Sequence, residues 1–213
     1  PQESRERQPL MQTEKLLGSY VYSDAYMDDD RLVIETLRSA RGDLLSCANY
    51  TRATGAVLNE QNKVSGVRCQ DMKTGREFTV RGRHVISTVG PWTDELGEKF
   101  FAQWKKVLRP TKGVHLTFEK KRLPLTSAVV MGAESRIVFG IPRHEMVIVG
   151  TTDTDFNQRP DEVSATPEDV NYLLGVVRQY FPGADLKAED IVATYAGVRP
   201  LVKDDAATEG KTS

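Results

Sequence analysis

Cysteine and histidine are both scarce in this chain of 213 residues, which has two cysteines and three histidines. Cys47 and Cys69 are too few for a disulfide framework. Both lie in apolar, strand-like segments, so we expect buried free thiols and a reducing compartment. No two histidines have the spacing of a zinc site, and the sequence therefore predicts no metal site.

Long apolar runs and an excess of charge of either sign are also missing. No stretch approaches the roughly 20 apolar residues that cross a bilayer, and the first 15 residues contain no apolar segment typical of a signal peptide. The formal net charge is −1, so the chain as a whole has no electrostatic attraction to nucleic acid.

Several nucleotide-binding and catalytic motifs are absent as well. The sequence has no G-x-G-x-x-G turn, no Walker A loop and no nucleophile elbow. It therefore encodes no complete Gly-rich loop for a dinucleotide pyrophosphate. The chain opens at Pro1 without an initiator Met and closes on a polar stretch, Glu209–Ser213, so we expect it to be a piece of a longer protein.

The remaining pattern predicts an α+β (mixed α/β) fold. Alternating apolar segments separated by turn residues indicate antiparallel strands, and helices are expected at three places. Residues 1–17 should form a loop or short helix. Residues 18–105 should contain a helix that starts after Asp28, a β-meander, a short buried strand at 84–88 and a second helix. Residues 106–200 should form an antiparallel sheet with a helix at 167–180, which Thr166 caps, and 201–213 should be a polar tail.

Four short blocks carry the candidate chemistry, and each is expected to be a strand that runs into a polar turn or helix. The first, STVGPW, contains Thr88, Gly90, Pro91 and Trp92. Gly lets a backbone approach a flat or anionic ligand, and a helix N-terminus adds positive potential. An ordinary strand–turn–helix junction with Trp92 in the core explains the same residues.

The second block, RPTKGVH, leads into a strand on which Lys112 and Val114 should face one way and Gly113 and His115 the other. His115 is then a candidate base with Arg109 or Lys112 nearby, because a nearby cation lowers the pKa of an imidazole and keeps it neutral. A half-buried histidine that bonds a backbone carbonyl is the commoner alternative.

The third and fourth blocks are VGTTD and TYAGVRPL. Thr151 and Thr152 end a hydrophobic strand, where their hydroxyls can bond a ligand or stabilise a turn. Arg199 stands before a proline, which restricts it to extended backbone. Its guanidinium suits a phosphate or carboxylate, and a structural ion pair with Asp204 or Asp205 is the alternative.

Taken together, GSYVYSDAYMDDDRL, STVGPWTDEL, RPTKGVHL, RIVFGIPRHEMVIVGTTD, VNYLLGVVRQYF and YAGVRPL resemble the flavin-dependent glycerol-3-phosphate dehydrogenases. The resemblance implies part of a split FAD-binding domain and an antiparallel substrate-domain sheet flanked by helices. It also implies oxidation of sn-glycerol 3-phosphate to dihydroxyacetone phosphate, with FAD as the hydride acceptor, membrane quinone as the electron acceptor, and a cytoplasmic protein peripheral at the membrane. A homodimer is compatible with it.

The resemblance also assigns roles to the candidate residues. Arg199 becomes a substrate ligand, His115 the base or substrate anchor at carbon 2, and Lys112 a further substrate contact or proton acceptor. Thr88, Gly90, Pro91 and Trp92 would lie along the flavin, and Thr151 and Thr152 would face the same cavity. The segment with the Gly-rich loop that holds the FAD pyrophosphate in the family has no counterpart here, so we expect this chain alone to bind FAD weakly or not at all and to have no turnover.

Two other readings remain open from the residues. One is a related FAD-dependent oxidase or dehydrogenase acting on an amino or hydroxy acid, whose carboxylate would also need Arg199. The other is a non-catalytic binding domain that offers its sheet edges to partners.

Overall fold

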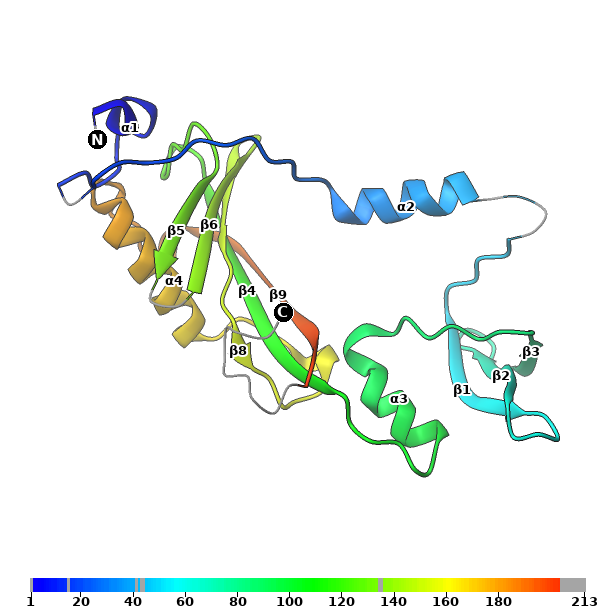
Figure 1. Cartoon of the computed structure of the whole chain (residues 1–213). Coiled ribbons are helices and arrows are strands. Elements are labelled where there is room, and N and C mark those ends of the chain that lie inside the picture. The colour runs from blue at the N-terminus through cyan, green and yellow to red at the C-terminus, as the bar shows by residue number, and fades with distance from the viewer. Residues whose placement is uncertain (1, 15, 41, 43–44, 134–135, 204–213) are drawn as a thin grey trace. The chain divides into compact units, whose positions relative to one another are not determined.

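The computed structural model describes residues 2–14, 16–40, 42, 45–133 and 136–203 (Figure 1). The chain divides into two compact units. Unit 1 contains residues 1–20, 89–97 and 103–213, and unit 2 contains residues 21–88 and 98–102. We expected a division near residue 105. The structure differs in that the first 20 residues and residues 89–97 belong with the later sheet.

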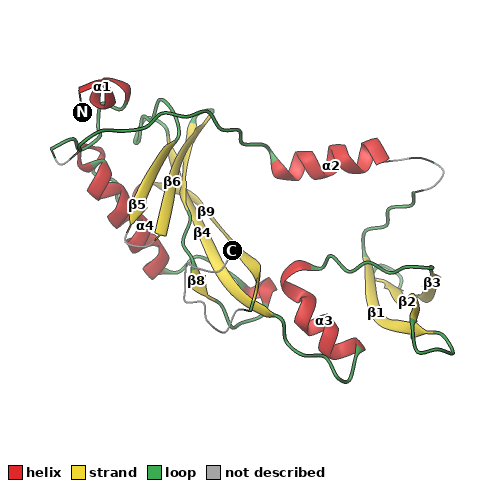
Figure 2. Cartoon of the chain, viewed as in Figure 1, coloured by secondary structure: helices red, strands yellow, loops and turns green. Residues whose placement is uncertain are grey.

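Unit 1 is built on a six-stranded antiparallel sheet (Figure 2). The sheet runs in the order β5-β6-β7-β4, β8 continues the β7 side of β4, and β9 pairs with the other side of β4. The strands are β4 (Leu108–Glu119), β5 (Val129–Ala133), β6 (Arg136–Arg143), β7 (Met146–Gly150), β8 (Thr154–Asp155) and β9 (Ile191–Val202). The mixed α and β composition with antiparallel sheets confirms the predicted fold class.

One face of this sheet is packed against helix α4 (Pro167–Tyr180), which lies along the strands in Figure 1. Alternate β4 residues Val114, Leu116 and Phe118 are fully buried, and they share a core with Leu173 and Val177 of α4. Burial of such side chains stabilises the fold by about 1.5–3 kcal/mol each. The other face of β4 is therefore the one available to a ligand.

The start of α4 follows the sequence prediction closely. The Thr166 side chain accepts a hydrogen bond from the Asp169 backbone, and the Asp169 carboxylate accepts from the Thr166 backbone, with Pro167 in the first turn. This capping box satisfies two backbone N–H groups that a helix N-terminus otherwise leaves without partners. The helix ends before Pro182, where η3 (Pro182–Ala184) begins.

Short elements complete unit 1. Helix α1 (Gln2–Arg7) precedes Gln8, whose side chain bonds Ser127 ahead of β5. The remaining elements are η1 (Gly90–Trp92), helix α3 (Thr93–Phe100, which crosses the unit boundary), η2 (Pro160–Glu162) and η4 (Ala188–Asp190).

Unit 2 contains the predicted meander and helix. Strands β1 (Thr51–Leu58), β2 (Val64–Asp71) and β3 (Glu77–Arg81) pair antiparallel in that order, with turns at the expected places. Helix α2 (Asp29–Ala40) begins directly after Asp28, as its acidic first turn predicts.

Two predictions for unit 2 were wrong. Residues 84–88 form no strand, because they pair with no other strand of the described chain, and Ile86 is 85% exposed. Their apolar run alone did not distinguish a buried strand from an extended segment. Cys69 is buried as expected, but Cys47 is exposed because it lies in a loop before β1 and not in a strand.

The ion pair between Arg122 and Asp190 gives a testable pH dependence. Arg122 donates from Nε and Nη2 to the two Asp190 oxygens at 2.7 and 3.0 Å. These bonds, with one from the Lys187 backbone, lower the pKa of Asp190 from 3.8 to about 2. A lowered carboxyl pKa stabilises the fold above pH 4, and this stabilisation is lost as the pH falls through about 2.

We therefore predict that Asp190→Asn lowers the free energy of unfolding at pH 6, and that the gap to the wild type narrows between pH 4 and pH 2. Urea unfolding at several pH values measures it. A gap that stays constant over that range would contradict the proposed linkage. Asp24→Asn, at an exposed carboxylate that forms no ion pair among the described residues, is the control.

Candidate active site

The candidate site lies on the face of the unit 1 sheet opposite α4. Because side chains alternate along a strand, Gly113 and His115 of β4 face away from the buried Val114. In the register of the sheet His115 pairs with Gly150 of β7 on one side and Tyr195 of β9 on the other. The predicted alternation of Lys112 and Val114 against Gly113 and His115 is thus confirmed.

His115 is half-buried between its two neighbours. Its ring stacks on Tyr195, with centroids 4.6 Å apart and planes 9° from parallel. On the other side it lies over Gly150, where an added Cβ would come within 2.3 Å of His115 Cδ2. Gly150 therefore has to lack a side chain for the imidazole to take this position.

The surroundings of His115 favour its neutral form. Burial is the main cause that lowers the pKa of the imidazole, and the positive charge of Arg199 lowers it further. A neutral imidazole at pH 7 can accept a proton, which a general base requires. No described residue hydrogen-bonds either ring nitrogen, so the alternative of a histidine satisfied by a backbone carbonyl does not apply within the described chain.

Arg199 reaches toward His115 across the sheet. It pairs with Thr111 in the register, but its guanidinium lies over Gly113, where an added Cβ would come within 2.5 Å of Nη2. Nη2 donates to Thr151 Oγ1 at 2.8 Å, and Nη1 donates to the Thr152 carbonyl at 3.2 Å. The two glycines at 113 and 150 thus let both functional side chains lie flat on the sheet.

Asp153 is the counter-ion of Arg199, at 3.4 Å from Nη1. The side chains are 35% and 22% exposed respectively, so the pair is only partly shielded from solvent. Both Nη1 hydrogens are occupied, whereas Nε and the second Nη2 hydrogen have no partner among the described residues. Nε and one Nη2 hydrogen are therefore left, within the described chain, to donate to an anion. Asp204 and Asp205, the expected partners, lie outside the described residues.

The two threonines at the end of β7 have different positions. Thr151 lies at the guanidinium and is fixed by donating to the Thr152 carbonyl at 3.0 Å. Thr152 is buried, and its hydroxyl accepts from the Val114 backbone at 3.0 Å. The Thr152 hydroxyl thus joins the turn to β4, and only its carbonyl contacts Arg199.

Lys112 is not brought to the face that carries His115. Its ammonium lies toward α4, where it pairs with Asp169 Oδ2 and donates to the Ser164 carbonyl at 3.5 Å. The two side chains are 10% and 5% exposed. Burial would raise the pKa of Asp169, but hydrogen bonds from Lys112 and Thr166 outweigh it and lower the pKa. These contacts indicate a structural role for Lys112 on the face opposite His115, and substrate binding by Lys112 stays a prediction.

The residues expected along a flavin fall in both units. Gly90, Pro91 and Trp92 form η1, which lies beside β9 in unit 1. Gly90 has a positive φ of 55°, and no atom lies within 4 Å of an added Cβ. Trp92 is exposed, so it is not the core residue of the alternative reading. Thr88 is an exposed residue at the end of a unit 2 segment.

Three residues of the site were missed in the sequence: Tyr195, Asp153 and Gly150. Tyr195 and Arg199 stand in the same strand with the alternation Tyr-x-Gly-x-Arg, which places them and Gly197 on one face. That alternation was a readable signal. The pairing of His115 with Gly150 depends on strand register, which no local pattern revealed.

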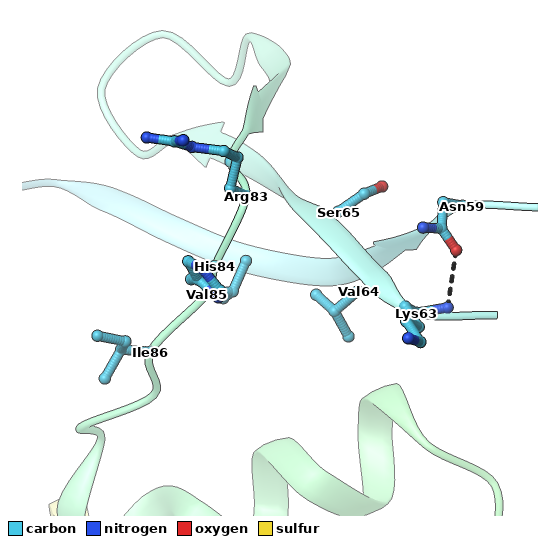
Figure 3. A pocket seen from close by; sticks show the side chains of 9 residues that line it. Asn59, Lys63, Val64, Ser65, Arg83, His84, Val85 and Ile86 are labelled. Atoms are coloured by element: carbon cyan, nitrogen blue, oxygen red, sulfur yellow. Dashed lines mark hydrogen bonds between the residues drawn. The ribbon is translucent and has the colours of Figure 1, made fainter. Parts of the chain in front are cut away.

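Unit 2 has a separate open cavity of about 690 Å³ (Figure 3). The cavity lies between the β1–β2 turn and the extended segment after β3, and Asn59 Oδ1 accepts from the Lys63 backbone at 2.9 Å at its edge. Its lining includes Arg83, His84 and Ile86, and none of the predicted site residues.

In the described part of the chain, no group of three His, Cys, Asp or Glu residues lies close enough together to hold a metal ion. No helix of these residues is long and apolar enough to cross a bilayer.

The FAD dependent oxidoreductase family matches residues 1–212.

The chain belongs to the FAD-dependent oxidoreductase family.

Among individual members, the chain is 37% identical to an alpha-glycerophosphate oxidase of Streptococcus pyogenes serotype M18, over 98% of this chain and 35% of the relative. It is 36% identical to an aerobic glycerol-3-phosphate dehydrogenase of Staphylococcus haemolyticus, over 93% and 36%. The chain thus spans about a third of the length of these relatives.

Solved structures agree with the assignment to this family. A glycerol-3-phosphate dehydrogenase from Bacillus halodurans, complexed with FAD, matches with a TM-score of 0.87 and 34% identity, over 96% of this chain and 41% of that chain. An L-proline dehydrogenase from P. horikoshii matches with a TM-score of 0.75 at 17% identity, over 97% and 53%, which is a likeness of fold alone.

The buried Lys112–Asp169 pair yields a stability prediction for this FAD-dependent oxidoreductase. Lys112→Met should destabilise the chain by about 3–5 kcal/mol, because it leaves a buried carboxylate without its counter-charge. Chemical unfolding of the variant measures the loss. Lys121→Met, at an exposed pair with Glu119, is the control and should change stability by less than about 1 kcal/mol. Equal effects of the two substitutions would contradict the structural role.

Proposed function

We propose that this chain is the middle segment of a flavoenzyme that oxidises sn-glycerol 3-phosphate to dihydroxyacetone phosphate. The observation that carries the proposal is the shared face on which the neutral His115 and the guanidinium of Arg199 meet. The names of the two curated relatives and of the Bacillus halodurans structure, all at 34–37% identity, support this substrate. The limited share of their length that the chain covers supports its being a segment.

His115 is proposed to take the hydroxyl proton at carbon 2. Oxidation of a secondary alcohol to a ketone removes this proton together with a hydride from the same carbon. A neutral imidazole without a hydrogen-bond partner in the described chain can accept the proton. FAD, when bound, supplies the acceptor for the hydride. The residues of this chain thus provide proton acceptance and positioning.

Arg199 is proposed to bind the substrate through its open Nε–Nη2 edge. Thr151, Thr152 and Asp153 hold the rest of the guanidinium, so the edge is oriented before the substrate arrives. Preorganised donors of this kind cost little reorganisation on binding. Asp153 balances one positive charge, so further positive charge for a phosphate dianion would come from groups outside this face.

The chain fits one part of a flavin site. Gly90 offers open backbone at the start of η1, and Gly197 on β9 likewise has no atom within 4 Å of an added Cβ. Such positions let a flat ring come close to the backbone. Gly90, Pro91 and Trp92, with Thr88, are proposed to lie along the flavin. The chain has no Gly-rich pyrophosphate loop, so we propose that it holds FAD weakly by itself and has no turnover alone.

The electron acceptor is proposed to be a membrane quinone, with the protein peripheral at the cytoplasmic side of the membrane and able to form a homodimer. The names of the relatives include both oxidase and dehydrogenase. Oxygen consumption measured against reduction of a soluble quinone distinguishes the two acceptors. A substrate panel that includes amino and hydroxy acids tests the alternative substrates, since a carboxylate could also occupy the Arg199 edge.

Removal of Arg199 tests the substrate assignment. In the longer flavin-loaded protein, Arg199→Ala should lower kcat/KM for sn-glycerol 3-phosphate by an amount that corresponds to about 2–5 kcal/mol, because the charge contact between the guanidinium and the substrate phosphate is lost. Steady-state kinetics measure it. Arg159→Ala, at an exposed pair on η2, serves as the control and should leave kcat/KM unchanged. If Arg199→Ala leaves both kcat and KM unchanged, the assignment is wrong.

Weak flavin binding by the isolated chain is tested separately. The purified chain should lose flavin absorbance on desalting, whereas the longer protein should keep it. A visible spectrum recorded before and after desalting measures the retained flavin. Absorbance that survives in the isolated chain would contradict the proposal that the missing loop is required.

A further inference from the structure

The orientation of His115 is fixed by unusual means. A histidine that works as a base is commonly oriented by a hydrogen bond at its second ring nitrogen. Here neither nitrogen has a partner among the described residues. The contacts that remain are the two faces of the ring, with Tyr195 stacked at 4.6 Å and the glycine at 150 on the β7 side.

The Tyr195 ring is placed for this contact by the register of the sheet. Tyr195 is the direct antiparallel partner of His115 across β4 and β9, and side chains of such partners stand on the same face. Aromatic pairs in direct contact contribute about 0.5–1.5 kcal/mol beyond burial of their area. That is enough to favour one orientation of the imidazole over others by roughly two- to tenfold.

We propose that Tyr195 is a positioning residue whose ring fixes the plane of the His115 imidazole and leaves both imidazole nitrogens free for the substrate.

The proposal goes beyond the roles of His115 and Arg199, and its kinetic arm rests on the proposed function. Tyr195 acts through stacking, so a phenylalanine should replace it. A direct substrate contact through the phenol would instead be lost in that replacement, because Tyr195 is 50% exposed. Comparison of Tyr195→Phe with Tyr195→Leu, which keeps bulk without an aromatic ring, separates the two roles.

The charged and titratable groups near the imidazole have to be held constant. These are Tyr195 and Arg199 on β9 and Asp153 after β7, whereas Lys112 and Asp169 are paired on the α4 side of the sheet. Neither Phe nor Leu changes the charge at pH 7. A shift in the titration of His115 between the two variants therefore reports on the ring contact.

The first test is proton NMR of the chain, with the His115 signals assigned from a His115→Gln variant. Stacking moves the His115 ring protons upfield. We expect this shift in the wild type and in Tyr195→Phe, and its loss in Tyr195→Leu, together with a higher His115 pKa as water reaches the ring. Val192→Ala, at an exposed position of β9, is the control and should leave the spectrum of His115 unchanged.

The second test is the pH profile of kcat and KM in the longer flavin-loaded protein. Tyr195→Leu should lower kcat by about two- to tenfold with a small change in KM, because the imidazole loses the orientational preference that stacking supplies. Tyr195→Phe should restore the wild-type values. The acidic limb of the profile should move upward in Tyr195→Leu alone.

The NMR outcome decides the proposal whatever the substrate is, and the kinetic outcome applies if the proposed function holds. Unchanged His115 shifts in Tyr195→Leu overturn it, whatever the activity. Loss of activity in Tyr195→Phe also overturns it, in favour of a phenol contact with the substrate. If the wild-type protein does not oxidise sn-glycerol 3-phosphate, the proposed function fails, and the NMR result alone then supports or overturns the role of Tyr195.

Discussion

The antiparallel register between β4 and β9 determines the candidate site. It sets Tyr195 beside His115, Gly197 beside Gly113 and Arg199 beside Thr111. A slip of one residue would turn β9 over and place Tyr195 and Arg199 on the α4 side. Packing on the α4 side favours this register, since Ala196 of β9 packs against the core that contains Val114, Leu116 and Phe118 of β4. Packing on one face therefore fixes the chemistry on the other.

Two glycines, Gly113 and Gly150, leave room on this face for the side chains of Arg199 and His115. A side chain at residue 113 would displace the guanidinium of Arg199, and one at residue 150 would displace the imidazole of His115. Atoms of both groups lie within 3 Å of the position that the Cβ would take. With glycine in both places, the imidazole of His115 can lie over Gly150 and the guanidinium of Arg199 over Gly113 on the same face of the sheet. Their proximity is also why the cation lowers the pKa of the imidazole. The position of Arg199 on this face therefore accounts both for the shape of the site and for part of the lowered pKa of His115.

Local patterns predicted much of this fold and part of the site. The capping box at Thr166, the helix after Asp28 and the turns of the meander follow from a few neighbouring residues, and the structure contains them. The alternation along β4 placed His115 on the open face and Lys112 on the other, yet no local pattern indicated Asp169 as the partner of Lys112. That contact joins residues 57 positions apart, and such pairs depend on the packing of a helix on a sheet.

Contacts between residues far apart in the sequence also explain the other differences between the predicted and the observed structure. Residues 84–88 have the composition of a buried strand, but a strand needs a neighbour, and none is present in the described chain. Asp153 is the counter-ion of Arg199 because the Arg199 side chain crosses β4 over Gly113 to the segment after β7, which spacing in the sequence did not indicate. The resemblance to flavin-dependent dehydrogenases could be seen in the sequence motifs, whereas the positions of those motifs in the fold depend on the pairing of the strands.

The most direct measurement is a crystal structure of the longer flavin-loaded protein with sn-glycerol 3-phosphate bound. The account predicts substrate oxygens on the Nε–Nη2 edge of Arg199 and the carbon 2 hydroxyl at about 3 Å from a His115 nitrogen. A substrate bound away from both side chains, with the open face of the β4–β9 sheet left empty, would contradict it.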